Sequence, residues 1–362
     1  MCIRDRGQGD ISEDLEDKAK HLGANKVIVE DLTEEFISHY VFPMFRCNTI
    51  FEGEYLLGTA IARPLIAKKL VEIGKLEGTN IICHGATGKG NDQIRFEIGA
   101  HALNKNIKVI APWREWDMVS RTDLMSYCKT HQIPMPASKA EEPPFSMDEN
   151  LLHISYEGGV LEDLKNSPPE EMWLNTKSLE KASETSEELS IEFSEGDPVA
   201  INNKKLPPAE IFRTLNTIGS KHGIGRIDIV ESRVTGMKSR GCYETPGGTI
   251  LLKTRRAMES LCLSGKEIKA KDNLIPEYAA LIYEGLWWSN KRLEIQDKVN
   301  SISKKVSGKV SVKLYKGNII SVSKESLNSL YDENKVSFEE QGGFSNEDMQ
   351  SHIEKNILDF DN

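Results

Sequence analysis

The sequence predicts an α/β protein, with a parallel-sheet domain in its N-terminal part and an α+β region after it. In the first part, short apolar runs typical of strands alternate with stretches of helical periodicity, which indicates strand–helix–strand units. A glycine-rich turn joins one of these strands to the next helix. After a proline-rich stretch at 133–144, the pattern changes to alternating strands and longer helices.

The elements of the first part follow from apolar spacing and from residues that start or stop helices. Asp31 and Glu34 form a candidate capping box, and Pro64 predicts a kink or a break in its helix. Residues 1–6 show neither pattern, so no element is expected there. The expected helices span 14–22, 33–42, 56–76 and 122–131, and the expected strands span 26–29, 80–83 and 107–111, with 80–83 buried.

The second part is expected to be α+β and to end in a separate tail. Met349, Ile353 and Ile357 recur every four residues, which predicts an amphipathic helix that docks on its own chain or on another subunit. The expected domains are therefore residues 1–137, 138–340 and 341–362. In the second, we expect strands over 189–193, 199–201 and 226–234, a hairpin of 310–314 with 319–322, helices over 209–220, 249–263 and 275–288, and a polar surface excursion over 166–188.

Composition excludes several classes of protein. The chain has 362 residues and a net charge of −10 without a long basic run, which argues against nucleic acid or an anionic membrane as its main partner. The six cysteines form no C-x-x-C pair and the eight histidines show no ligand spacing, so neither a metal site nor a disulfide framework is indicated. No membrane-spanning run or signal peptide is recognisable, and a reduced, cytoplasmic setting is expected.

The stretch 81–97 is the most informative in the chain. Gly85, Gly88 and Gly90 follow a strand and precede a helix, so free backbone N–H groups and the helix dipole would favour an anion there. The spacing fits neither the P-loop nor the G-x-G-x-x-G fingerprint. A tight turn within an α/β sheet, without a ligand, therefore remains the alternative.

Polar residues around this turn favour a binding site. Asp92 and Arg95 are three residues apart, so they share a helix face, and Asn91 or Asp92 is a natural N-cap. With Thr87, they offer hydroxyl, amide, carboxylate and guanidinium groups, which suits a zwitterionic amino acid beside a phosphate. The apolar face of this helix is expected to carry Ile94, Ile98 and Ala102.

Four stretches, in order, resemble signature segments of the argininosuccinate synthases. They lie at 55–64, 84–97, 146–157 and 236–246, within a resemblance that extends from about residue 7 to 345. The resemblance implies a nucleotide-binding domain of the ATP-pyrophosphatase, adenine nucleotide alpha hydrolase-like type, then a synthetase domain and a C-terminal oligomerisation helix. It implies ligation of citrulline and aspartate at the expense of ATP in arginine biosynthesis and the urea cycle, through a citrulline adenylate, with release of AMP and pyrophosphate. It also implies Mg²⁺ and a cytoplasmic homotetramer.

The same resemblance assigns candidate site residues. It implies no catalytic side chain and no protein metal ligand, and Ala60 stands where the family often has a serine. The implied contacts are Gly85 to ATP; Thr87, Asn91 and Asp92 to aspartate; and Tyr55, Asn91, Arg95, Ser146, Ser155, Glu231 and Tyr243 to citrulline.

Structural explanations of these residues stay open at this stage. Ser146 and Ser155 are also typical of helix caps. Glu231 is consistent with an outward strand residue paired to Arg233. Trp287 and its neighbour Trp288 are typical of a core or of a subunit interface.

The family's Ser-Gly-Gly-x-Asp-Thr-Ser pyrophosphate loop has no counterpart in this sequence. We therefore expect a chain that lacks the family's first strand and this loop, with residues 1–6 foreign to the fold. One alternative is a non-catalytic remnant that only binds ligands. Another is a related ATP-pyrophosphatase ligase that acts on a different carbonyl or amide.

Overall fold

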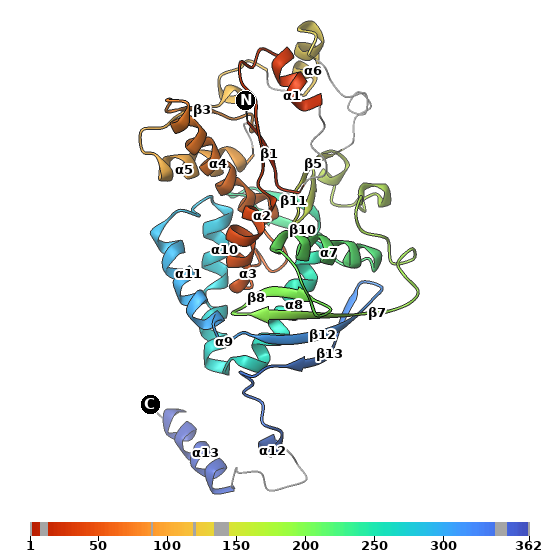
Figure 1. Ribbon diagram of the computed structural model, residues 1–362, viewed down its shortest axis with the longest axis vertical. Helices are drawn as coiled ribbons and strands as arrows, with labels where there is room; N and C mark the ends of the chain where they lie inside the picture. Colours follow the sequence, from red (N-terminus) through yellow and green to blue (C-terminus); the bar gives the residue numbers. More distant parts are fainter. Residues whose placement is uncertain are drawn as a thin grey trace.

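The fold is known from a computed structural model, in which most of the N-terminal part lies at one end of an elongated body and residues 32–65 pack against the C-terminal part (Figure 1). The N-terminal strands and helices α1 (Asp14–His21) and α6 (Arg121–Thr130) lie at one end, and a five-stranded sheet with its helices lies towards the other. The structure describes residues 2–7, 14–87, 90–118, 121–133, 145–336 and 346–360. The predicted boundary between the domains falls in 134–144 and lies outside these residues.

The N-terminal part is the predicted parallel α/β arrangement. Strand β1 (Cys2–Asp5) pairs in parallel with β2 (Ile28–Asp31), and β3 (Ile81–Cys83) pairs in parallel with β4 (Lys108–Ile110). The expectation of no element in residues 1–6 is therefore wrong, because β1 lies there. The helices of this part are α1 (Asp14–His21), α4 (Gly58–Leu76), α5 (Asp92–Leu103) and α6 (Arg121–Thr130), with a short helix η2 (Pro112–Arg114).

Helix α5 turns a different face inward from the one predicted. Ile98 is exposed, whereas Arg95 and Gly99 are buried. A Cβ on Gly99 would lie 3.2 Å from the Cβ of Ala67, so the close approach of α5 to α4 depends on this glycine. The packing of small residues thus brings Arg95 to the inner face. Strand β3 also differs from expectation, because Ile81 is 51% exposed.

The predicted helix over 33–42 extends further and crosses a π-helical turn. It consists of α2 (Thr33–Phe36), η1 (Ile37–Val41) and α3 (Phe42–Arg46). The predicted capping box is absent, because the carboxylate of Glu34 accepts instead from the backbone N–H of Ala209 at 3.1 Å. Asp31 accepts from the N–H of Thr33 at 2.8 Å. Helix α4 continues across Pro64 without a break.

The C-terminal part contains two antiparallel sheets and a group of helices. The four-stranded sheet has the order β10 (Arg226–Ser232), β11 (Lys238–Glu244), β6 (Ile154–Glu157), β5 (Ser146–Glu149). The five-stranded sheet has the order β13 (Asn318–Glu325), β12 (Gly308–Tyr315), β7 (Glu187–Ser194), β8 (Asp197–Ile201), β9 (Lys204–Lys205). The helices are η4 (Gly159–Glu162), η5 (Glu170–Met172), α7 (Pro208–Lys221), α8 (Pro246–Cys262), α9 (Gly265–Asp272), α10 (Ile275–Tyr283), α11 (Asn290–Ser303), α12 (Glu333–Val336) and α13 (Asn346–Phe360).

The predicted hairpin, the β7–β8 pair and helices α7 and α8 are confirmed, and the predicted helix over 275–288 ends earlier, at Tyr283. Strands β5, β6 and β11 and helices α9 and α11 were not predicted. The sequences of β5 and β11 are mostly polar, so they lack the apolar alternation that identifies a strand. Ser146 and Ser155 consequently lie on neighbouring strands and do not cap helices.

A buried cluster of charges holds α8 to its neighbours. The carboxylate of Glu259 contacts the guanidinium of Arg255 one turn earlier and lies 3.3 Å from the ammonium of Lys271 on α9. The amide of Asn48 donates to the same carboxylate at 2.6 Å. Arg255, Glu259 and Lys271 are all buried, so water does not screen these charges.

Replacement of Glu259 is expected to destabilise the fold strongly. In Glu259→Ala, the buried Arg255 and Lys271 lose their shared counter-ion, and we expect the free energy of unfolding to fall by about 3–5 kcal/mol. Urea unfolding followed by circular dichroism measures this change. The control is Glu188→Ala. The Glu188 carboxylate pairs with Lys313 at 3.7 Å on the exposed surface, so its removal should lower the free energy of unfolding by less than about 1 kcal/mol. Equal losses in the two variants would contradict this account.

Candidate functional site

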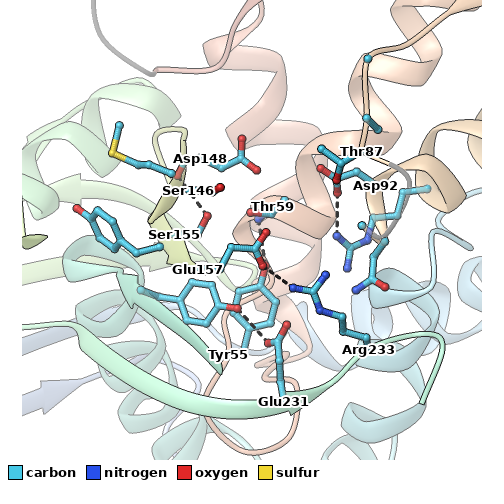
Figure 2. Close-up of a pocket in the computed structure, with 18 residues that line it drawn as sticks. Tyr55, Thr59, Thr87, Asp92, Ser146, Asp148, Ser155, Glu157, Glu231 and Arg233 are labelled. Carbon is cyan, nitrogen blue, oxygen red and sulfur yellow. Dashed lines mark hydrogen bonds and ion pairs between the residues drawn. The ribbon is translucent and has the colours of Figure 1, made fainter. Parts of the chain in front are cut away.

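A pocket of about 290 Å³ lies where the glycine-rich turn, α4 and α5 meet the four-stranded sheet (Figure 2). Thr87 and Asp92 lie on one side of it, and Ser146, Asp148 and Ser155 lie on the wall opposite. Every residue that the sequence analysis assigned to a ligand lines this pocket, namely Tyr55, Gly85, Thr87, Asn91, Asp92, Arg95, Ser146, Ser155, Glu231 and Tyr243. Residues from both parts of the chain therefore surround one cavity.

The glycine-rich turn and the start of α5 form one side of the pocket. The N–H of Gly90 donates to the carbonyl of Thr87 at 3.1 Å, which closes the turn, while Gly88 and Lys89 lie outside the described residues. Asn91 occupies the N-cap position, but its side chain does not cap the helix. Because the first N–H groups of a helix lack partners within it, this end can receive an anionic group.

Asn91 instead ties the turn to the C-terminal part. Its amide nitrogen donates to the hydroxyl of Tyr283 at 3.0 Å, and its amide oxygen accepts from the N–H of Val234 at 3.3 Å. The donor and the acceptor of the amide therefore both form hydrogen bonds with the C-terminal part. A ligand that contacts Asn91 must therefore share or replace these hydrogen bonds.

Asp92 is held between two arginines. Arg63 on α4 donates from Nε to Asp92 at 2.9 Å and bridges to Asp148 on β5 at 2.8 Å. Arg95 donates from Nη1 to the other oxygen of Asp92 at 3.0 Å. Burial favours the neutral acid, but the charges of Arg63 and Arg95 outweigh it and lower the pKa of Asp92 below its usual value. The pocket thus presents an ionised carboxylate, which can accept hydrogen bonds from an ammonium group.

Glu231 is the second carboxylate of the pocket, and its environment raises its pKa, whereas that of Asp92 is lowered. The hydroxyls of Tyr243 and Tyr283 donate to its two oxygens at 3.1 and 2.9 Å. Burial raises the pKa of Glu231, because these neutral partners compensate the lost hydration only in part. The alternative of an outward Glu231 paired with Arg233 is wrong, since Arg233 pairs with Glu157 at 2.7 Å.

A neutral histidine supports the aromatic side of the pocket. The ring of Tyr55 stacks on that of Tyr243 with centroids 4.3 Å apart. His153 shares a hydrogen bond of 2.9 Å with the hydroxyl of Thr59, and burial lowers its pKa to about 3, so the ring carries no charge. A Cβ on Gly58 would lie 2.4 Å from this ring, so the helix can approach His153 only with glycine there.

Sequence reasoning missed Arg63, Asp148 and the rim pair of Glu157 and Arg233. A signal for Arg63 was present, because it is the one charge within the apolar run 55–67. A buried arginine in such a run needs a carboxylate partner, and its partners lie on distant segments that the sequence pattern does not connect. Within the described residues, no group of three His, Cys, Asp or Glu side chains is arranged to hold a metal ion.

The fold and the site together define a class of protein. It has an α/β domain with a phosphate-suited turn, an α+β domain, and between them a pocket whose paired charges fit an amino acid. Two family models match the chain, the N-terminal HUP domain of arginosuccinate synthase over residues 1–134 and the C-terminal domain of the same enzyme over residues 145–361. The chain belongs to the argininosuccinate synthase family.

Similar curated proteins agree with this assignment. An argininosuccinate synthase of Helicobacter hepaticus is 55% identical over 358 residues. Those of Ectopseudomonas mendocina and Pseudomonas fluorescens are each 53% identical over 355 residues. Each comparison covers 98% of this chain and 88% of the relative.

The lowered pKa of Asp92 predicts how its contribution to stability changes with pH. At pH 7, the free energy of unfolding of Asp92→Asn should be about 3 kcal/mol lower than that of the unmodified protein, because the ionised carboxylate balances two buried arginines. This contribution is complete above the unfolded-state pKa of about 4 and disappears as pH falls through the lower folded-state pKa. Urea midpoints of the two proteins should be measured from pH 7 to 3.5. The difference between the midpoint of the unmodified protein and that of Asp92→Asn should become smaller only below about pH 4.

Asp117→Asn is the control for this series, since Asp117 is an exposed aspartate. It should leave the urea midpoint unchanged at every pH. If the urea midpoints of Asp92→Asn and the unmodified protein already become equal between pH 7 and 5, Asp92 is not stabilised as an anion.

Proposed function

We propose that this chain ligates citrulline and aspartate to argininosuccinate with cleavage of ATP to AMP and pyrophosphate, as a step of arginine biosynthesis. The observation that supports this most directly is the single pocket, which is lined by all the residues that the family resemblance assigns to the three substrates. The names of the curated relatives are consistent with the same activity. A remnant that only binds ligands would share the pocket but would not turn over.

In this proposal, aspartate lies at the start of α5. Its ammonium group is accepted by the ionised Asp92, and its carboxylates accept from Thr87, Asn91 and the open helix end. Citrulline lies towards the sheet. Arg95 uses Nε and Nη1 for Tyr283 and Asp92, which leaves Nη2 for the citrulline carboxylate. The remaining citrulline contacts are assigned to Tyr55, Asn91, Ser146, Ser155, Glu231 and Tyr243.

The chemistry takes place in two displacements. The ureido oxygen of citrulline attacks the α-phosphorus of ATP, and the bond from that phosphorus to the bridging oxygen breaks to release pyrophosphate. The ammonium group of aspartate then loses a proton to solvent, and the resulting amine attacks the ureido carbon, loses a second proton, and displaces AMP. The pocket residues contribute by holding the two amino acids side by side and by balancing their charges, and none of them becomes covalently modified.

ATP is assigned to the turn at Gly85, where no atom of the described structure within 4 Å would oppose a Cβ, so the backbone faces open space. We propose that Mg²⁺ arrives with ATP as part of the substrate. Since no protein cluster suited to a metal occurs in the described part of the chain, the ion would be held by phosphate oxygens and water. It would balance the charge of the leaving pyrophosphate.

We also propose a cytoplasmic homotetramer, in which α13 packs on another subunit. Met349, Ile353 and Ile357 on α13 are 50%, 45% and 55% exposed, so the apolar face of this helix is uncovered by its own chain. Figure 1 shows α13 apart from the remainder of the chain. No helix in the described residues is long and apolar enough to cross a membrane.

Pyrophosphate release tests the activity directly. We expect release that requires ATP, citrulline and aspartate together. Thr87→Val should raise KM for aspartate about tenfold, while KM for citrulline changes by less than about twofold, because one hydrogen bond to a charged carboxylate is lost. Arg95→Lys should affect citrulline more than aspartate. Binding of both amino acids without any pyrophosphate release would favour the non-catalytic alternative.

Matched substitutions on α13 test the assembly. Ile353→Glu places a charge on the apolar face, and Lys355→Glu places the same charge about half a helical turn away. Light scattering should give four times 40.6 kDa for the unmodified chain and for Lys355→Glu, and a smaller mass for Ile353→Glu. A tetramer that survives Ile353→Glu would show that α13 does not form the interface.

A further inference from the structure

A second cavity lies between helices of the N-terminal part and α11. Its volume is about 270 Å³, and α2, η1, α3, α4, α11 and the Trp287–Trp288 pair contribute to its lining. None of its lining residues belongs to the first pocket. Neither the family resemblance nor the proposed reaction gives these side chains a role.

The feature that distinguishes this cavity is Arg292. Arg63, Arg95 and Arg255 are also buried, and each lies within ion-pair distance of a carboxylate. Arg292 is only 5% exposed, yet no carboxylate among the described residues lies within 4.0 Å of its guanidinium. It is the exception among the buried arginines of the described structure.

The close polar contacts of the Arg292 guanidinium are all neutral, and the carboxylate of Asp297 acts on it only from beyond ion-pair distance. Its Nε donates to the carbonyl of Trp287 at 2.6 Å, and its plane lies 4.2 Å from the centre of the Trp287 ring. The hydroxyl of Tyr278 is the other close polar group, and it is itself buried. Burial lowers the pKa of Arg292, which is the effect of a charge without a counter-ion. Such a charge is costly unless an anion pairs with it.

The other charges around the cavity do not supply that anion. Glu35 is engaged by Lys68 at 2.7 Å and by Lys69 at 3.2 Å, and Glu72 lies 3.8 and 3.5 Å from the same two lysines, so these four charges balance one another. Arg46 pairs with Asp197 and donates to the amide oxygen of Asn300 at 3.0 Å. The excess positive charge of the cavity is therefore that of Arg292, although the whole chain carries −10.

Trp288 shows independently that an acceptor is missing. Its indole N–H is buried and has no hydrogen-bond partner among the described residues. Most buried donors in folded proteins have a partner, so an orphaned indole N–H on a residue that lines the same cavity as an uncompensated arginine indicates an absent acceptor. An oxyanion would satisfy both groups.

We propose that this cavity binds a small oxyanion, a carboxylate or a phosphate, with Arg292 as the anchoring cation and Lys68 as a second positive charge. A guanidinium on an aromatic ring presents its remaining N–H groups in a fixed plane, which suits two oxygens of one ligand. The site is separate from the pocket of the proposed reaction, so an anion here would act on the protein as an effector and not as a substrate.

Calorimetric titration with inorganic phosphate, and separately with acetate, tests this site in the full chain. We expect phosphate, acetate or both to bind the unmodified protein, and Arg292→Gln to weaken that binding by at least about tenfold. Lys68→Gln removes a charge from a partly exposed position, so it tests the site even where Arg292→Gln does not fold. It should weaken binding severalfold, whereas Lys75→Gln, further along α4, should not.

Thr87→Val controls for anions that bind at the first pocket. Binding that survives Thr87→Val and is weakened in the Lys68 and Arg292 variants supports the proposal. Phosphate binding without acetate binding would identify the ligand as a phosphate, and binding of both would admit carboxylates. No binding of either anion up to about 10 mM, or binding that responds only to Thr87→Val, would overturn it.

Discussion

The guanidinium of Arg63 connects the two parts of this protein beside the pocket. It lies on α4, is buried, and contacts Asp92 at the start of α5 and Asp148 on β5. A buried arginine is stable only when its charge is balanced, and here the balance requires one carboxylate from each part. The geometry of Asp92, and with it the charge pattern of the pocket, therefore depends on correct contact between the two parts.

Tyr283 has a comparable role on the other side of the pocket. Its hydroxyl receives a hydrogen bond from Asn91 and donates one to Glu231, and its carbonyl accepts from Arg95 at 2.8 Å. The ring stacks on Phe51 with centroids 4.0 Å apart. Because one residue at the end of α10 contacts three residues assigned to ligands, a shift of that helix would move them together. The network holds the site in position before any ligand binds, which reduces the entropy lost on binding.

Much of the fold could be predicted from the sequence, because the spacing of apolar residues indicates most helices and the apolar strands. The strands β5 and β11 were not predicted, since their sequences are mostly polar and lack the apolar alternation of a strand. The buried face of α5 was also mispredicted, because the small Gly99 determines the packing and turns Arg95 inward. The residues of the site were found through family resemblance. Their physical partners, such as Arg63 and Asp148, were not, because local patterns do not reveal contacts between segments 85 residues apart.

The bridge from Arg63 to Asp148 also has a consequence for exchanging parts between relatives. A chimera that takes its first part from one member of the family and its second from another must bring a matching arginine and aspartate to the same place. Where the pair matches, the new chain inherits a pocket assembled from two sources. Where it does not, an unbalanced charge remains at a junction that the two parts also close with one shared hydrophobic core. The arginine and its aspartate are therefore a contact that a working chimera must keep, in addition to the core that both parts share.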